Sequence, residues 1–434
     1  MPSTYPVLQL ALDFANLSQA MRAAKEAVQA GSIWLEAGTP LIKSEGLDTV
    51  RALRTEFPQH TIIADMKVMD AGRAEVEMAA TAGANIVAVL GAASDSTIEE
   101  CVEAGGRYGA RIMVDLAEVA DPVARAARAQ ELGAGIIGVH CPIDVQMRGG
   151  DPFDTLAAVA QAVDIPIAVA GGINSETAPK AIQAGASIVI VGGAINKAPD
   201  ATQATRDVLQ AMSTGVAVET DLYKRGGVDQ IREMFGKVSA ANVSDAQHRR
   251  GWLPGIMPLD ASMHCVGPAT TVWAYPGDWN KPVQAIDQAQ EGDVLVVDVR
   301  GEGPAVWGEE ASKSCVAKGI AGIVIHGAAR DSREIRELGF PVFSSLVCPA
   351  AGDPKGLGMI GVPLKVGATA IRPGDWIVAD ADGVVVVPQE KAVETANRAM
   401  GVVEREAREK AEIMKGSTLG QVAELHRWEQ KRGE

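Results

Sequence analysis

The segment 61–90, TIIADMKVMDAGRAEVEMAATAGANIVAVL, contains the pattern that decides the fold. It begins with a β-branched apolar run, continues with an Ala-rich amphipathic stretch and closes on Gly83 before the next apolar run begins. Such runs are typical of strands buried on both faces, and Gly readily ends a helix in the left-handed conformation. The segment therefore predicts a strand, a helix and the next strand of a parallel α/β fold.

The same pattern recurs along the first half of the chain. It gives eight apolar runs: VLQLALDF (7–14), IWLEAGT (33–39), TIIADMKV (61–68), IVAVLGA (86–92), RIMVDLA (111–117), IIGVHC (136–141), PIAVAGG (166–172) and SIVIVGG (187–193). Their ends repeat about every 26 residues, which is a normal length for a βα unit. Eight such units predict a (β/α)8 TIM barrel. An open doubly wound sheet is the alternative, but it would not usually contain eight evenly spaced parallel strands.

Most of these runs end in a residue that can carry chemistry. The ends are Asp13, Glu36, Asp65 with Lys67, Gly91, Asp115, His140, Gly171 and Gly192. Because the reaction site of a barrel is built at the C-terminal rim of its strands, we expect the polar side chains to meet in one cavity. Alternatively they could cap the following helices, but capping residues are Ser, Thr, Asn or Asp, and this set includes Glu, Lys and His.

The D-x-K-x-x-D motif of Asp65, Lys67 and Asp70 predicts an ammonium group held between two carboxylates. Asp65 and Lys67 are alternate residues of a strand, so their side chains point the same way. Glu36 on the neighbouring strand can share a hard divalent cation with Asp65. A cation next to a lysine stabilises an enediolate oxygen, so we expect Mg²⁺ or Mn²⁺ as cofactor.

The last two runs end in the glycine pairs Gly171-Gly172 and Gly192-Gly193. Their backbone N–H groups, with a short helix after them, can hold a phosphate, which is common after strands 7 and 8 of phosphosugar barrels. A sugar phosphate is therefore the expected substrate.

Over residues 5 to about 212 the chain resembles the 3-hexulose-6-phosphate synthases of the orotidine-monophosphate decarboxylase superfamily. The motifs that carry the resemblance are LALDF (10–14), WLEAGTPLIKSEGLDTVRALR (34–54), IIADMKVMDAGRAEVEMAATAGA (62–84), RIMVDL (111–116), AVAGGIN (168–174) and IVIVGGAI (188–195). The resemblance implies a Mg²⁺-dependent aldol addition of formaldehyde to ribulose 5-phosphate that gives arabino-3-hexulose 6-phosphate.

The resemblance also implies roles for the rim residues. Glu36 and Asp65 would hold the metal and Lys67 would stabilise the enediolate. The other implied roles are positioning of substrate and lysine by Asp13 and Asp70, proton transfer at C1 by His140, and substrate binding by Asp115. Pro142 stands where the family usually has Gly, and its fixed φ restricts the loop. A second interpretation is a decarboxylase of a 3-keto sugar-acid phosphate, because loss of CO₂ also leaves an enediolate.

From about Ser213 the repeat stops, and six of the seven tryptophans lie beyond residue 250. We therefore expect the barrel to occupy 1–213, a linker with a short helix 214–236, and a second α/β domain 237–434. Its expected strands follow a Gly/Pro-rich stretch and are DVLVVDV (293–299), AGIVIHGA (321–328), FPVFSS (340–345) and WIVADADGVVVVP (376–388). The charged helix from Gln389 onward is expected to be solvated or to pack against another subunit.

Arg330 and Asp331 are the chemical candidates of this second domain. The Arg can fork a carboxylate and the Asp can hold a metal through water. In context, segments 306–343 and 367–388 resemble the RraA-like family, which includes 4-hydroxy-4-methyl-2-oxoglutarate aldolases and oxaloacetate decarboxylases. The resemblance implies that a 2-oxo acid is bound by Arg330 and by backbone amides of Gly308, Glu309, Glu310 and Ala311. His326 stands where the family often has Asp. A regulator or oligomerisation module without chemistry is the alternative.

Composition excludes several other classes. Forty Lys plus Arg against 55 Asp plus Glu give a net charge of −15, and no basic cluster could track a nucleic-acid backbone. The Cys and His residues show no CxxC, HxxxH or HExxH spacing. The apolar runs are too short for a membrane span, and no signal peptide is evident. We expect a cytoplasmic homo-oligomer that binds neither nucleic acid nor membrane.

Overall fold

The computed structural model describes residues 5–31 and 33–425. The chain forms two compact units. The first extends to Arg225 and resumes at Glu404, and the second consists of Gly226–Val403.

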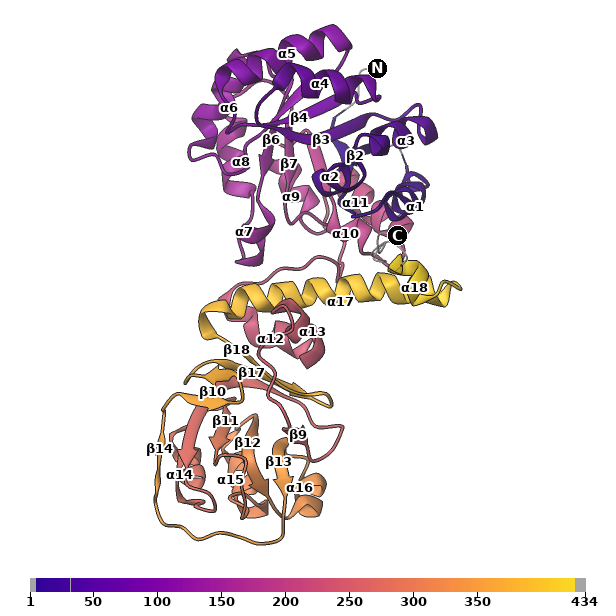
Figure 1. The fold of residues 1–434 in the computed structure, drawn as a ribbon. Helices are drawn as coiled ribbons and strands as arrows, with labels where there is room; N and C mark the ends of the chain where they lie inside the picture. The colour runs from indigo at the N-terminus through magenta and orange to yellow at the C-terminus, as the bar shows by residue number, and fades with distance from the viewer. Residues whose placement is uncertain (1–4, 32, 426–434) are drawn as a thin grey trace, which may run out of the picture. The chain divides into compact units, whose positions relative to one another are not determined.

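The first unit contains a closed barrel of eight parallel strands (Figure 1), as the sequence predicts. The strands are β1 (Val7–Leu12), β2 (Trp34–Ala37), β3 (Ile62–Val68), β4 (Ile86–Leu90), β5 (Arg111–Asp115), β6 (Ile136–His140), β7 (Ile167–Ala170) and β8 (Ile188–Val191). The barrel closes because β1 pairs in parallel with both β2 and β8.

Helices follow the strands around the barrel. They are α1 (Leu17–Val28), α2 (Thr39–Glu45), α3 (Asp48–Glu56), α4 (Gly72–Thr81), α5 (Asp95–Tyr108), α6 (Pro122–Glu131), α7 (Ile143–Met147), α8 (Phe153–Ala160), α9 (Ala178–Gln183), α10 (Gly193–Asn196) and α11 (Ala201–Thr214). Their apolar faces pack on the outward side chains of the strands, such as Leu35 and Ala64.

The two-residue period of the strands separates an apolar layer from a polar rim inside the barrel. A buried cluster fills the interior with Trp34, Ile63, Ile86, Met113, Ile136, Ala168 and Ile188. Successive side chains alternate between the two faces, so the residue two positions later faces the interior again, nearer the C-terminal rim. On β2, β3 and β5 that residue is Glu36, Asp65 and Asp115.

The C-terminal segment differs from the prediction, which places all of 237–434 in the second domain. From Glu404 onward, α17 (Ala392–Met414) and α18 (Leu419–Val422) belong to the barrel unit. Both terminal nitrogens of Arg408 donate to the carboxylate of Glu26 on α1, at 2.7 and 3.0 Å. The amide of Gln19 donates to the carbonyl of Val422 at 2.8 Å, and Figure 1 shows α18 beside α1. These partners are separated by 382 and 403 residues in the sequence, so no local pattern indicates the pairing.

The second unit is built on a mixed sheet of strand order β18-β17-β10-β11-β12-β13-β9, with β14 paired to β10. Its strands are β9 (Met257–Pro258), β10 (Cys265–Ala274), β11 (Val294–Asp298), β12 (Gly322–Ala329), β13 (Val342–Val347), β14 (Gly358–Ile360), β17 (Trp376–Asp380) and β18 (Gly383–Val387), with a separate hairpin of β15 (Leu364–Val366) and β16 (Thr369–Ile371). The four predicted strand segments are confirmed, and WIVADADGVVVVP forms two strands. The Gly/Pro-rich stretch also contains a ten-residue strand, β10, which the sequence pattern does not predict.

The helices of this unit are α12 (Ile231–Gly236), α13 (Ala240–Ala246), α14 (Asn280–Gln288), α15 (Glu309–Lys318), α16 (Ser332–Leu338) and the first part of α17, with short 3₁₀ turns η1 (Val228–Gln230) and η2 (Gln389–Lys391). The predicted linker 214–236 therefore ends inside a folded unit. Phe235 of α12 is fully buried in a core with Val385 and Ala396, because this apolar face needs the second unit to cover it.

None of the helices in residues 5–31 and 33–425 combines the length and the apolar character needed to cross a bilayer. Self-association of the chain stays a prediction.

Substitution of Arg408 can test whether the C-terminal segment is part of the barrel unit. Arg408→Ala removes hydrogen bonds to two carboxylates, and we expect the opening free energy of α1 and of 404–425 to fall by about 1–3 kcal/mol. Hydrogen exchange followed by mass spectrometry measures this for each peptide. Lys410→Ala, which removes a side chain 73% exposed on the same helix, should change nothing. Loss of protection in β11 and β12 instead of α1 would contradict the assignment.

Candidate active site

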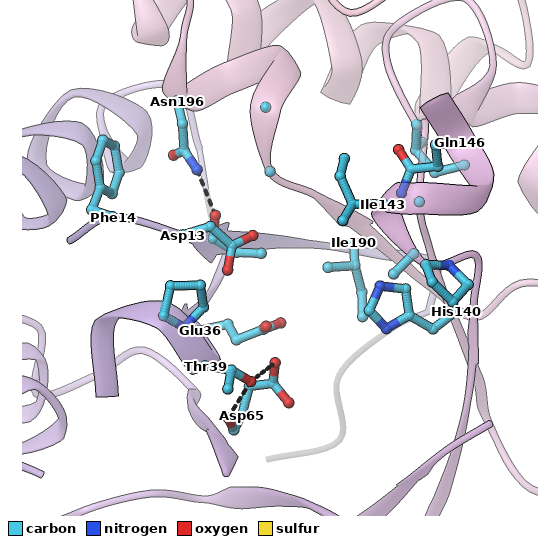
Figure 2. A pocket seen from close by; sticks show the side chains of 18 of the residues that line it. Asp13, Phe14, Glu36, Thr39, Asp65, His140, Ile143, Gln146, Ile190 and Asn196 are labelled. Carbon is cyan, nitrogen blue, oxygen red and sulfur yellow. Dashed lines mark hydrogen bonds between the residues drawn. The ribbon is translucent and has the colours of Figure 1, made fainter. Parts of the chain in front are cut away.

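A cavity of about 970 Å³ opens at the C-terminal rim of the barrel. Asp13, Glu36 and Asp65 line one side of it, and His140 and Gln146 lie across from them (Figure 2). The cavity also contains Lys67 and Asp115 and all four predicted glycines, Gly171, Gly172, Gly192 and Gly193. The rim residues thus meet in one place, as the strand ends predict.

Lys67 lies at the centre of a chain of charged contacts. Its Nζ lies 2.9 Å from Oδ2 of Asp65 and 3.1 Å from Oδ2 of Asp115. Burial alone would lower the pKa of Lys67, but the two carboxylates outweigh it and raise the pKa above its usual value. Lys67 has a left-handed φ of 48° at an irregularity in the pairing of β3 with β4. The lysine is therefore held protonated and aimed into the cavity.

Asp115 links Lys67 to His140. Nδ1 of His140 lies 3.0 Å from Oδ2 of Asp115, and the backbone N–H of Ala117 donates to Oδ1 at 2.9 Å. Burial would raise the pKa of Asp115, but the hydrogen bond and charge of His140, with Lys67, lower it well below its usual range. Asp115 is therefore an ionised carboxylate that orients both the lysine and the imidazole.

Asp70 is not where the sequence places it. The D-x-K-x-x-D motif predicts Lys67 between Asp65 and Asp70, but Asp70 is exposed and does not line the cavity. The chain leaves the barrel after Val68, and the left-handed Ala71 (φ 48°) turns it into α4. Asp115 of β5 takes the place expected for Asp70, because the closed barrel brings β5 within reach of β3.

The β1–β2 side of the cavity carries more negative charge than its partners neutralise. Burial, Asp65 and Asp13 raise the pKa of Glu36 well above its usual value, and its carboxylate accepts a hydrogen bond from Gln9. Asp13 faces the open part of the cavity, and its pKa is raised by the surrounding protein and by Asp65. The hydroxyl of Thr39 donates to Oδ2 of Asp65 at 2.7 Å (Figure 2).

These carboxylates bear on the predicted metal. Among residues 5–31 and 33–425, no group of three or more His, Cys, Asp or Glu side chains is arranged as a ready metal cage. Mg²⁺ is commonly held by only one or two carboxylates together with water and substrate oxygens. The pKa values of Asp13 and Glu36 are raised partly by neighbouring carboxylates, so a cation bound beside Asp65 would be stabilised by these negative charges. The donor set fits a hard divalent cation.

The paired glycines form the opposite end of the cavity. Gly171 and Gly172 have φ values of 102° and 75°, which side chains rarely adopt. A Cβ at Gly171 would lie 2.4 Å from the carbonyl oxygen of Cys141. The chain can pass this close to β6 only with glycine there. Pro142 precedes α7, which contributes Gln146 to the cavity.

Several residues of the site are not predicted by the strand-end pattern in the sequence. Gln9 is buried on β1 and donates to Glu36. Its position could have indicated that it faces the barrel interior, because it lies four residues before Asp13 on a strand whose side chains alternate between two faces. Thr39 follows β2, and its hydroxyl donates to both the carboxylate and the backbone carbonyl oxygen of Asp65. Tyr223 comes from the predicted linker, where nothing in the sequence marks it as a cavity residue.

The candidates of the second unit lie together at two helix starts. Oδ2 of Asp331, which has a left-handed φ of 56°, accepts from the backbone N–H of Glu309 at 3.1 Å. Nε of Arg330 lies 3.4 Å from the same oxygen. The predicted residues Gly308, Glu309, Glu310 and Ala311 thus begin α15 beside the pair. His326, which replaces the expected Asp, places Nδ1 2.8 Å from Oδ1 of Asp298.

Comparison with known proteins also divides the chain into a barrel and a second domain. Residues 6–208 match the Orotidine 5'-phosphate decarboxylase / HUMPS family, and residues 240–386 match Aldolase/RraA. The 3-hexulose-6-phosphate synthase of Bacillus subtilis is 39% identical over 209 residues, which are 48% of this chain and 99% of the relative.

Two solved structures are also similar. The 3-hexulose-6-phosphate synthase from Salmonella typhimurium is 35% identical, covering 48% of this chain and 100% of its own, with a TM-score of 0.47. An RraA-family protein of Streptomyces coelicolor is 30% identical, covering 44% and 100%, with a TM-score of 0.39. Because the Bacillus subtilis synthase is 39% identical and is matched over 99% of its length, the chain is a member of the Orotidine 5'-phosphate decarboxylase / HUMPS family, with a 3-hexulose-6-phosphate synthase-like barrel followed by an RraA-like domain.

Proposed function

We propose that the barrel catalyses the aldol addition of formaldehyde to ribulose 5-phosphate, giving arabino-3-hexulose 6-phosphate, with Mg²⁺ or Mn²⁺ as cofactor. The observation that carries the proposal is the chain of contacts Asp65–Lys67–Asp115–His140 at the rim of the cavity. The synthases of Bacillus subtilis and Mycobacterium gastri, 39% and 36% identical, support the same reaction type.

The residues in this chain of contacts would each have a different role in the reaction. When Nδ1 of His140 donates to Asp115, Nε2 can take a proton from C1 of ribulose 5-phosphate. The Lys67 ammonium then stabilises the negative charge on the enediolate oxygen. C1 forms a bond to the formaldehyde carbon, and the proton on His140 passes to the former aldehyde oxygen. No atom is lost, which matches an addition.

Glu36 and Asp65 would hold the divalent cation, which would act as a Lewis acid toward the substrate oxygens. Asp13 lies close enough to Glu36 to raise the pKa of that carboxyl. Asp13 would therefore face substrate hydroxyls beside the metal.

A decarboxylase acting on a 3-keto sugar-acid phosphate would use the same lysine and cation, because CO₂ loss leaves an enediolate as well. Turnover of such a substrate without turnover of ribulose 5-phosphate and formaldehyde would replace the synthase proposal.

For the second unit we propose a metal-dependent lyase that acts on a 2-oxo acid. Arg330 would bind the carboxylate of the substrate and Asp331 would hold the cation through water. The proposal is supported by the position of both residues beside the amide of Glu309 at the start of α15. A regulator or oligomerisation module is the competing function, and activity that depends on Asp331 would separate the two.

Lys67→Ala should lower kcat of the formaldehyde reaction by at least about 100-fold, because a preorganised cation is removed from the enediolate. Steady-state kinetics with ribulose 5-phosphate measures this, with circular dichroism to verify folding. Lys25→Ala, at a side chain 52% exposed on α1, is the matched control and should retain full activity. Wild-type turnover in Lys67→Ala would refute the role of the lysine.

Removal of divalent metal should abolish the barrel reaction. Dialysis against EDTA should reduce turnover to background, and Mg²⁺ or Mn²⁺ should restore it, because Glu36 and Asp65 provide oxygen ligands for hard cations. Isothermal titration of Mg²⁺ should show weaker binding in Asp65→Asn than in the wild type. Full activity after exhaustive chelation would exclude the metal-dependent mechanism.

Asp331→Ala should abolish Mg²⁺-dependent decarboxylation of oxaloacetate, whereas Arg330→Lys should chiefly raise KM, because a point charge cannot replace two parallel hydrogen bonds. Pyruvate formation measures both effects. Glu337→Ala, at a side chain 65% exposed on the same helix, serves as control. The formaldehyde reaction should be unaffected by all three changes. An intact protein without decarboxylation would favour the regulator or oligomerisation module.

A further inference from the structure

One side of the barrel cavity is lined by residues that lie outside the family match. They are Tyr223, from the segment after α11, and Arg405, Arg408, Glu409, Glu412 and Val422 from α17 and α18. The family match ends at residue 208, and 209 residues of this chain already cover 99% of the Bacillus subtilis synthase. This part of the cavity wall is therefore an addition to the matched barrel.

The carboxylate of Glu404 fixes the added segments to the barrel. It is 5% exposed and accepts hydrogen bonds from both terminal nitrogens of Arg225, at 3.0 and 2.9 Å. It also accepts from the backbone N–H of Tyr223 at 2.8 Å and from Nζ of Lys197, which follows α10, at 3.3 Å. Because a buried carboxylate with charged partners is strongly oriented, the segment around Tyr223 and the helix are held at the rim.

Tyr223 extends between the two glycine pairs. A Cβ at Gly193 would lie 2.3 Å from Cε2 of Tyr223, so the ring rests directly on this glycine. The hydroxyl donates to Oε1 of Gln146 at 3.0 Å. Nε2 of Gln146 would lie 3.0 Å from a Cβ at Gly171. The tyrosine thus closes the end of the cavity where both glycine pairs present backbone to a ligand.

The charges of the cavity are unevenly distributed. The rim around Lys67 contains four carboxylates, Asp13, Glu36, Asp65 and Asp115. On the side of the added segments, the cavity is lined by three cations, Lys197, Arg405 and Arg408, and by two carboxylates, Glu409 and Glu412. A phosphate dianion is repelled by the first region and attracted by the second.

Arg405 is the cation of this region that is best placed to receive an anion. Its side chain is 60% exposed, and its Nε lies 3.9 Å from Glu409, a long pair on the surface of the cavity. Burial lowers the pKa of Lys197, and the positive charges of Arg225 and Arg405 lower it further against the opposing effect of Glu404. An anion bound here would relieve that repulsion.

We propose that Arg405 binds the phosphate group of the sugar-phosphate substrate and that Tyr223 positions it by closing the cavity over the glycine pairs. The C-terminal part of α17 is then a component of the barrel's substrate site. This inference rests on the proposed function for its substrate class, a phosphate monoester.

The first test measures binding without turnover. Isothermal titration of the full-length protein with inorganic phosphate should show a Kd about tenfold or more higher in Arg405→Ala than in the wild type, because a charge-assisted hydrogen bond is lost. Arg405→Lys should recover part of the affinity. Tyr223→Ala should weaken binding, whereas Tyr223→Phe, which keeps the ring over Gly193, should weaken it less. Lys410→Ala, which removes an exposed side chain five residues further along the helix, is the control and should match the wild type.

The second test separates this inference from the proposed reaction. In the formaldehyde assay, Arg405→Ala should raise KM for ribulose 5-phosphate, with kcat within about twofold and KM for formaldehyde unchanged. If the wild type lacks this activity but still binds inorganic phosphate in an Arg405-dependent manner, the reaction is wrong and the phosphate site stands. Unchanged phosphate affinity in Arg405→Ala, or a lower kcat with unchanged affinity, overturns the site.

Discussion

Lys67 brings one positive charge to a rim that holds the carboxylates of Asp13, Glu36, Asp65 and Asp115, and the chemistry of the rim depends on how that charge is shared. The ammonium lies between Asp65 of β3 and Asp115 of β5, so it spans two strands that are not neighbours in the barrel. Charges removed from water are stable only when they are paired and hydrogen-bonded. Asp115 meets this condition through Lys67, His140 and a backbone amide. The unbalanced charge is left on the β1–β2 side, where Asp13 and Glu36 have raised pKa values and a cation would be stabilised.

A second constraint concerns the order of the chain. The second unit lies between Arg225 and Glu404 in sequence, so it is an insertion into the barrel unit. Such an insertion requires its two ends to lie close together. The backbone N–H and carbonyl of Gly226 both bond to the side chain of Asn397 on α17, at 2.9 and 3.0 Å, which holds the start of the second unit beside the helix at its end. On the barrel side, Arg225 and Glu404 form the matching pair.

The carboxylate–histidine pairs of the two units are built alike. In each unit an Asp at the end of one parallel strand accepts from Nδ1 of a His on a neighbouring strand, Asp115 with His140 and Asp298 with His326. Parallel strands place their carboxyl ends at the same edge, so such pairs form readily in both folds. In the barrel the pair continues to Lys67, whereas Arg330 and Asp331 of the second unit lie at helix starts and contact each other.

The sequence by itself determined the barrel and most of its rim. Eight apolar runs of even spacing specify eight buried parallel strands, and period two along each strand places Glu36, Asp65 and Asp115 above an apolar layer. These are local properties, because strand alternation and helix termination depend on neighbouring residues. The sequence does not predict β10, because Gly267 and Pro268 are unusual in strands and obscure the alternation of buried and partly buried positions from Cys265 to Thr271.

Only the tertiary structure decided which residues meet across long separations. Asp115, and not Asp70, lies beside Lys67. Glu26 pairs with Arg408, and Tyr223 donates a hydrogen bond to Gln146. The tertiary structure also assigned the charged C-terminal helix from Glu404 to the barrel unit, although the helical pattern continues unbroken through that point. The physical reason is that an ion pair is specified by three-dimensional proximity, whereas a helical or strand pattern records only which face of an element is buried.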